Sequence, residues 1–219
     1  MKKKFIVIIS LIVIVALFLF FYSFYSEKEH SDSQYSLSQK EINLLQEGDI
    51  ILRHGFGLVS DIIVKSLKEK YDVSHCGIIC KNNKGKINVI HSVSQTLSDV
   101  DGIQLHEINR FVKDSRENSI IVVRYKLPFK KSQSCISEKA KYYLAKEIPF
   151  DNSFDIEDSS EFYCSELLWK IILIEYEKDI FKYELAEKNE HLKLKVFWDT
   201  AYFDVIINHH LRRKNLKEI

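Results

Sequence analysis

The sequence lacks an excess of charge of either sign, because 32 lysines and arginines face 31 aspartates and glutamates, which gives a net charge of +1. Proteins that bind nucleic acid usually carry a clustered basic face. The balance therefore argues against a nucleic-acid partner. At 219 residues the chain has room for one sizeable domain and an appendage, since domains commonly take roughly 100–200 residues.

Cysteine is scarce, and its spacing does not fit a disulfide scaffold. The cysteines are Cys76, Cys80, Cys135 and Cys164. We expect the first two on one strand, where a rise of about 3.3 Å per residue separates them by more than the ~4–7 Å between Cα atoms that a disulfide allows. No CxxC pair occurs, and no set of cysteines and histidines has zinc-ligand spacing. We therefore expect no metal and no organic cofactor.

Residues 5–25 lack charge, glycine and proline altogether. A bilayer core of ~30 Å needs about 20 apolar residues in a helix. A cleaved signal peptide usually has only ~7–15 apolar residues before a small-residue cleavage site, and no cysteine follows that could take a lipid. We therefore expect an uncleaved, single-pass transmembrane anchor. Three lysines precede it, so the positive-inside rule predicts a cytosolic N-terminus and a domain on the periplasmic or extracellular face.

The next segment is polar and serine-rich, without apolar rhythm, which is typical of a linker. The organisation predicted from composition is a cytosolic N-terminus at 1–4, a transmembrane anchor at 5–25, a polar linker at 26–42 and a folded domain at 43–219.

The rest of the chain mixes strands and helices without strict alternation. The β-branched runs predict strands at 49–54, 73–80, 87–93 and 119–127, and the apolar periodicity predicts helices at 57–70, 137–148 and 164–176. A charged segment at 177–195 is also expected to be helical. Because the central strands look antiparallel, the predicted fold class is α+β, with an antiparallel sheet packed against helices.

Cys164 stands where a polar, acidic loop meets a very apolar helix, in "EFYCSELLW". The first turn of a helix offers unpaired N–H groups and the positive end of the helix dipole. Both stabilise a thiolate and can later hold the oxyanion of an acyl intermediate. The alternative is a buried cysteine that only packs, since free cysteine is among the most buried residue types.

A cysteine nucleophile needs a base, which is almost always a histidine, and a group that orients the imidazole. His75, in "VSHCGII", is followed by a glycine that leaves room beside it, and His91 lies on the expected neighbouring strand. Two histidines on paired strands can meet as cross-strand neighbours. The alternatives are a pair of half-buried structural histidines and a metal site of His75, His91 and Cys76, for which the sequence offers no fourth donor.

The motifs "EGDIILRHG", "SHCGII", "VIH" and "YCSELLW", in this order, resemble the circularly permuted branch of the NlpC-type papain-like amidases, the YaeF/YiiX group. The resemblance covers roughly residues 45–176 and implies a permuted papain-like fold. It also implies that Cys164 is the nucleophile, His75 the general base and acid, and His91 the orienting third member. The third position is often Glu in permuted members and commonly His in ordinary NlpC-type relatives, so the role of His91 is less firmly implied.

The resemblance further implies an oxyanion pocket or cleft at Tyr163 and Ser165, beside the backbone N–H of Cys164. Arg53 and His54 end the first strand. The alternatives for them are a position that faces the cleft and an exposed strand end, and we favour the exposed strand end. The function implied is thiol-dependent hydrolysis of an amide bond in a peptide, a small amide or an acyl-lipid substrate, including cell-wall peptides and N-acyl amines. The alternative is a non-catalytic papain-like binding or scaffold domain tethered to the membrane.

Overall fold

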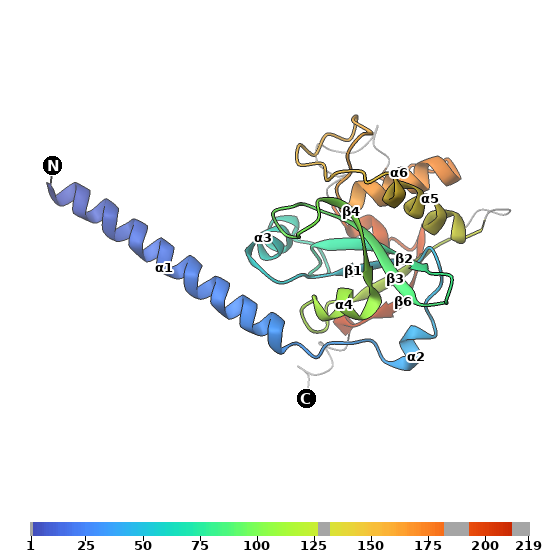
Figure 1. Cartoon of the computed structure of the whole chain (residues 1–219), viewed down its shortest axis with the longest axis horizontal. Coiled ribbons are helices and arrows are strands. Elements are labelled where there is room, and N and C mark those ends of the chain that lie inside the picture. The colour runs from blue at the N-terminus through green and yellow to red at the C-terminus, as the bar shows by residue number, and fades with distance from the viewer. Residues whose placement is uncertain (1, 127–131, 182–192, 212–219) are drawn as a thin grey trace.

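The computed structural model describes residues 2–126, 132–181 and 193–211, and Figure 1 shows a long helix projecting from a domain built around one sheet. The sheet strands are β1 (Ile50–Arg53), β2 (His75–Lys81), β3 (Ile87–Val93), β4 (Gly102–Glu107), β5 (Ile121–Tyr125) and β6 (Phe203–Asn208). Their order is β4-β3-β2-β1-β5-β6, and every neighbouring pair is antiparallel. The predicted α+β class with an antiparallel sheet is confirmed.

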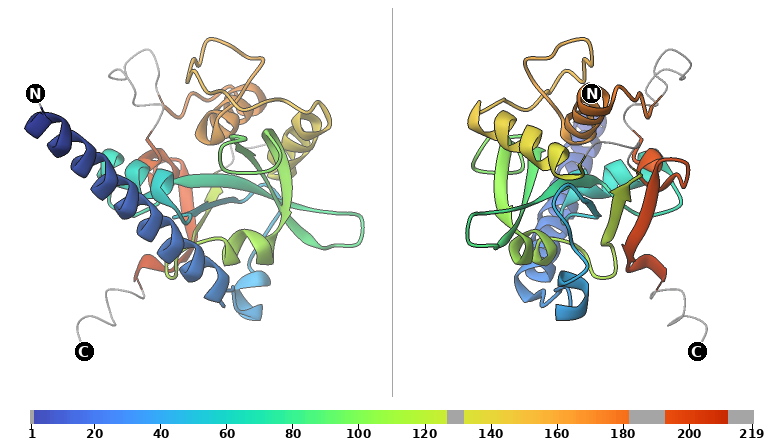
Figure 2. Two further views of the ribbon diagram at one scale, coloured as in Figure 1. Left: turned by 60° about the vertical axis from the view of Figure 1, so that its left-hand side comes forward. Right: turned by 90° about the vertical axis from the view of Figure 1, so that its right-hand side faces the viewer.

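Helices cover both faces of the sheet, which explains why its central strands are apolar throughout. The helices after the first are α2 (Gln39–Ile42), α3 (Leu58–Leu67), α4 (Ile108–Lys113), α5 (Ser134–Ala145) and α6 (Cys164–Tyr176), with a 3-10 turn at Lys195–Trp198. Figure 2 shows α5 and α6 on one side of the sheet and α4 and α2 on the other. Ile50 and Leu52 of β1 belong to the core beneath α6, whereas Ile51 belongs to the core around α4. Most of the expected charged helix at 177–195 lies outside the described residues.

The first helix, α1 (Lys2–Asp32), is long and apolar enough to cross a membrane, and none of its apolar stretch is buried against the domain. It continues through the beginning of the expected linker at 26–42. Beyond it Leu37 is buried in the core around α4, and Glu41 accepts a hydrogen bond from His209 at 2.8 Å. This segment differs from the expected linker because its polar side chains find partners on the domain, which composition does not reveal.

Asp49, just before β1, is expected to be a main contributor to stability. Its carboxylate is fully buried and accepts hydrogen bonds from Nε and Nη2 of Arg124 on β5, at 2.7 and 2.8 Å. The Asp49→Ala substitution would leave the guanidinium without this partner, so we expect a loss of about 3 kcal/mol in the free energy of unfolding. Chemical denaturation of the full chain in detergent measures it.

Asp204→Ala is the matched control for this prediction. Asp204 of β6 also forms an ion pair, with Lys126 just after β5 at 3.3 Å, but 64% of its side chain is exposed. Exposed pairs contribute less than about 1 kcal/mol. Equal losses in the free energy of unfolding for Asp49→Ala and Asp204→Ala would contradict the expectation that the buried ion pair contributes more than the exposed one.

Candidate active site

Cys164 is the first residue of α6, and Tyr163 is the N-cap. The N–H of Leu167 donates to the Tyr163 carbonyl at 3.0 Å and closes the first turn, and the Glu166 carboxylate accepts from the Tyr163 N–H at 3.3 Å. The backbone N–H groups of Cys164 and Ser165 belong to that first turn, where a helix directs its N–H groups out of the end. The predicted start of the helix at the cysteine is confirmed.

His75 and His91 meet as cross-strand neighbours. Nε2 of His75, at the start of β2, lies 2.8 Å from Nδ1 of His91 on β3. Gly77 makes this approach possible, because a Cβ at that position would lie 2.5 Å from the Val89 side chain and 3.1 Å from the Cβ of His91. The expectation that the glycine leaves room beside the pair agrees with this geometry.

A third histidine, His106 on β4, extends the pair into a row across three strands. Its Nδ1 lies 3.2 Å from Nε2 of His91. Burial and the neighbouring charge of His75 hold the pKa of His91 well below its usual range, and burial also lowers the pKa of His106. His91 is therefore neutral. If His75 donates to its Nδ1, the one proton of His91 lies on Nε2 and is donated to His106.

The environment of Cys164 favours its thiolate. A hydrogen bond from the Cys76 side chain makes the largest contribution to lowering the pKa of Cys164. A hydrogen bond from His75 and the charge of that ring lower it further. Together these effects outweigh burial, which acts in the opposite direction, and hold the pKa of Cys164 well below its usual range. Burial, with the neighbouring Cys164, raises the pKa of Cys76 well above the usual range, so Cys76 stays a thiol that donates.

Arg53 lies within the site, which corrects the expectation of an exposed strand end. Burial lowers its pKa to about 10, so it keeps its charge at neutral pH. Its Nη1 donates to the Phe111 carbonyl at 2.9 Å, and its guanidinium lies 4.2 Å from the centre of the Phe111 ring. The same ring packs beneath His75 and His91, at 6.0 and 5.2 Å between ring centres. Phe111 of α4 therefore packs against Arg53 and against His75 and His91, two of the three histidines in the row.

These groups open into a cavity of about 610 Å³, a volume typical of small-molecule sites. Of the residues predicted from sequence, Cys164, His75, Tyr163 and Ser165 line it, whereas His91 lies buried behind His75. The oxyanion role of Tyr163 and Ser165 stays a prediction. Among the described residues no group of three or more His, Cys, Asp or Glu side chains is placed to hold a metal ion.

Sequence reasoning missed Cys76 and His106, and for Arg53 it favoured the exposed strand end over the position at the cleft that the structure shows. The signal for His106 was weak, because the short run "GIQLHE" begins with glycine and was not recognised as a strand. Cys76 was considered only as a possible disulfide or metal partner. Its position directly after His75 could have indicated a second sulfur near the nucleophile.

Comparison with known proteins adds the following. The model of the family "Permuted papain-like amidase enzyme, YaeF/YiiX, C92 family" matches residues 44–207. Among solved structures, that of the metalloprotein yiiX from Escherichia coli O157:H7 is similar, with a TM-score of 0.56 and 22% sequence identity over 74% of this chain and 97% of that one. At this identity the likeness concerns the fold. Comparison with curated proteins gives no match.

Proposed function

Because the chain belongs to the family of permuted papain-like amidases of the YaeF/YiiX type, which are papain-like cysteine amidases and peptidases, we propose that it hydrolyses amide bonds with Cys164, His75 and His91 as its catalytic triad. The observation that carries this proposal is the position of His75 between the two others. The His75 ring lowers the pKa of the Cys164 thiol through its hydrogen bond and charge, and its Nε2 lies 2.8 Å from Nδ1 of His91. A nucleophile, a base and an orienting group in this order make up a triad.

The reaction begins from the Cys164 thiolate beside a protonated His75. The sulfur attacks the carbonyl carbon, a C–S bond forms, and the carbonyl electron pair moves to oxygen, where N–H groups at the start of α6 hold it. His75 gives its proton to the nitrogen as the C–N bond breaks and the amine leaves. His75 then takes a proton from water, whose oxygen attacks the acyl-enzyme. The C–S bond breaks, the acid leaves, and the thiolate–imidazolium pair is restored.

His91 acts on the orientation of His75. Its Nδ1 accepts from Nε2–H of His75, which leaves Nδ1 of His75 for the sulfur. The burial that keeps His91 neutral is what keeps its Nδ1 an acceptor. His106 is a positioning residue in this account, because it fixes the proton of His91 on the far nitrogen.

We expect His91→Ala to lower kcat roughly 10²-fold or more, because His75 would lose the partner that fixes its ring and proton. His91→Asn should retain most of the activity, since an amide oxygen can accept from the same N–H. Steady-state hydrolysis of an acyl aminomethylcoumarin amide measures both. If the two variants lose activity equally and unfold at the wild-type temperature, a hydrogen bond from His75 to residue 91 is not what orients the His75 ring.

The length and apolar composition of α1 support membrane anchoring, and the three lysines before the apolar run favour a domain on the periplasmic or extracellular face. We propose a single-pass anchor that is not cleaved. Protease added to intact spheroplasts that express the full chain should degrade the domain, and alkaline washing should leave the chain in the membrane. Protection of the domain until the spheroplasts are lysed would reverse the proposed orientation. The substrates proposed are peptides of the cell wall or N-acyl amines.

A further inference from the structure

α3 carries its apolar side chains on the surface of the domain. None of its residues is buried, and Leu58, Val59 and Ile62 are 40, 43 and 52% exposed. A helix with an apolar stripe normally turns that stripe to the core. The core of the domain therefore does not cover this stripe.

The same face forms one wall of the active-site cavity. Val59, Ile62, Ile63 and Leu67 of α3 line the cavity that also contains Cys164. Other apolar side chains that line it are Phe56, Val93, Leu97, Phe150, Phe154 and Leu194. A substrate group that occupies the space between α3 and the cysteine is therefore in contact mainly with hydrocarbon.

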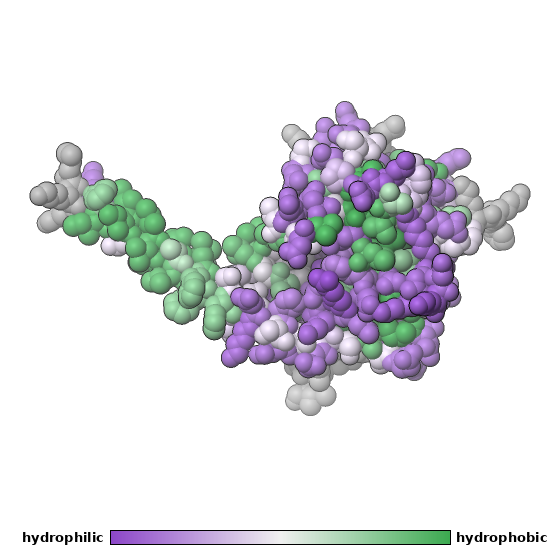
Figure 3. All heavy atoms as spheres, viewed as in Figure 1, coloured by the Kyte–Doolittle hydropathy of each residue, from purple (hydrophilic) through white to green (hydrophobic). Residues whose placement is uncertain are grey.

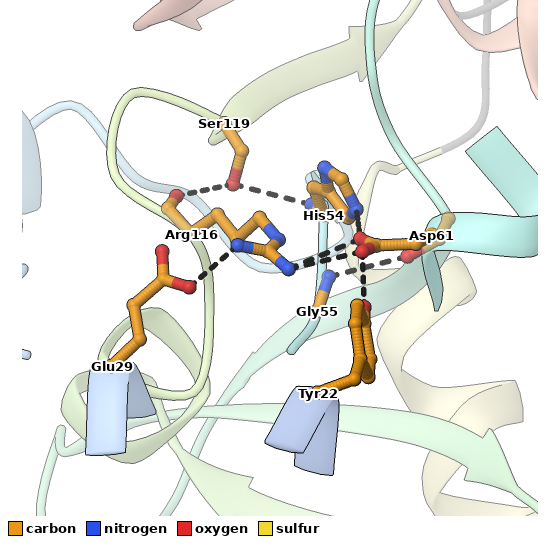
Figure 4. Close-up of polar contacts among 8 residues, drawn as sticks. Tyr22, Glu29, His54, Gly55, Asp61, Arg116 and Ser119 are labelled. Carbon is orange, nitrogen blue, oxygen red and sulfur yellow. Dashed lines mark hydrogen bonds and ion pairs between the residues drawn. The ribbon is translucent and has the colours of Figure 1, made fainter. Parts of the chain in front are cut away.

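Polar contacts fix the end of α1 beside α3. Figure 4 shows Tyr22 donating a hydrogen bond to Asp61 of α3, while Arg116 joins Asp61 at 3.2 Å and Glu29 of α1 at 2.7 Å. The next residue, His30, bonds Asp114 at 2.8 Å and itself lines the cavity. The end of the apolar helix is thus a part of the cavity rim.

These contacts fix the height of the cavity relative to a membrane. The apolar stretch from Phe5 to Phe21 is about 26 Å long at 1.5 Å per residue, close to the ~30 Å of a bilayer core. Tyr22 follows directly, at the level where aromatic side chains meet headgroups. Because Tyr22 bonds Asp61, α3 lies at the same level. Figure 3 shows the apolar surface of α1 continuing onto the neighbouring part of the domain.

From this arrangement we infer that the cavity accepts the acyl chain of an N-acyl amide that lies in the bilayer that α1 spans, and that α3 is the surface along which the chain enters. The inference rests on the proposed amidase function and specifies its substrate class. The acyl carbonyl reaches Cys164 from the membrane side, and the chain stays in apolar surroundings throughout. Relative to substrate dissolved in water, each methylene that passes into the bilayer and then into the cavity gains a factor of about four in affinity, so long chains are strongly preferred over short ones.

The test uses the full chain in phosphatidylcholine vesicles and acyl aminomethylcoumarin amides of 2, 8 and 12 carbons. We expect kcat/KM to rise at least ~100-fold from the 2-carbon to the 12-carbon amide. Ile62→Asp should reduce this ratio at least ~10-fold, because it places a charge in the path of the chain. The matched control is Leu105→Asp, which changes an apolar side chain of similar exposure on β4 outside the cavity lining and should keep the wild-type ratio.

A second measurement does not depend on turnover. The Cys164→Ala protein in the same vesicles is irradiated with a palmitoyl amide that carries a diazirine on its chain, and crosslinks are located by mass spectrometry. Crosslinks within residues 56–67 that Ile62→Asp removes would support the inference, and crosslinks confined to α1 would overturn it.

The failure of this inference is distinguishable from the failure of the proposed function. Hydrolysis that requires Cys164 but has the same chain-length ratio in wild type and Ile62→Asp overturns the acyl entry surface and leaves the amidase in place. If no amide is hydrolysed in a Cys164-dependent way, the amidase proposal fails, and the crosslinks alone decide whether the cavity binds acyl chains.

Discussion

Replacing Cys164 with alanine should lower amide hydrolysis by about 10⁴-fold or more, to the level set by substrate binding and the helix N–H groups alone. The effect is large because the sulfur forms the bond to the acyl group, and the chain has no other thiol with a comparable environment. The pKa of Cys164 is lowered by its Cys76 and His75 partners, whereas burial raises that of Cys80 to about 11. Hydrolysis of an acyl aminomethylcoumarin amide by matched preparations measures the loss.

Cys135→Ala is the control for this variant. Cys135 is a free, half-buried cysteine of α5 that does not line the cavity. Its replacement should leave hydrolysis unchanged. Activity in Cys164→Ala within tenfold of wild type would exclude a covalent mechanism at this residue. Amide hydrolysis by the wild type no faster than the uncatalysed reaction would instead favour a binding or scaffold role for the domain.

Replacing His75 with alanine should reduce hydrolysis by roughly 10³-fold or more, because one change removes the thiolate partner, the acid for the leaving amine and the base for water. It should also raise the pKa of Cys164, since the hydrogen bond and the charge of His75 both lower it. The thiolate would then be lost as the pH falls through a higher value than in the wild type. The pH dependence of single-turnover acylation measures this shift.

Imidazole added to His75→Ala distinguishes a chemical role from a structural one. A small base can occupy the vacated space and should restore part of the hydrolysis in proportion to its neutral form. His210→Ala, a histidine outside the cavity lining, should be active without imidazole. No rescue, together with a lowered unfolding temperature for His75→Ala alone, would point to a structural role for this ring.

Much of the fold follows from the sequence because its long, strongly periodic segments fold as their patterns indicate. The β-branched runs of β2 and β3 form an antiparallel pair, and α6 begins at Cys164. His75 and His91 are diagonal neighbours because of that pairing, and Gly77 of β2 leaves the space for their contact. Local pattern and tertiary structure agree at these positions.

The features that sequence did not reveal depend on tertiary contacts. β4 and α4 are short, so neither His106 nor the Phe111 support beneath the row was expected. Arg53 looks like an exposed strand end until Phe111 and the Asp114 carbonyl are seen to cover it. The polar residues after the apolar run resemble a linker because composition does not show that Glu29 and His30 find partners 80 or more residues away.

The most direct test of the central claim is the rate of alkylation of Cys164 by iodoacetamide as a function of pH, in wild type and in His75→Ala, with the modified residue located by mass spectrometry. An ordinary thiol has a pKa of about 8.5 and reacts slowly below pH 7. We expect wild-type Cys164 to react rapidly below pH 7 and much more slowly in His75→Ala, while Cys135 is the internal reference in both proteins. Labelling of Cys164 no faster than that of Cys135 in both proteins would contradict the thiolate–imidazolium pair.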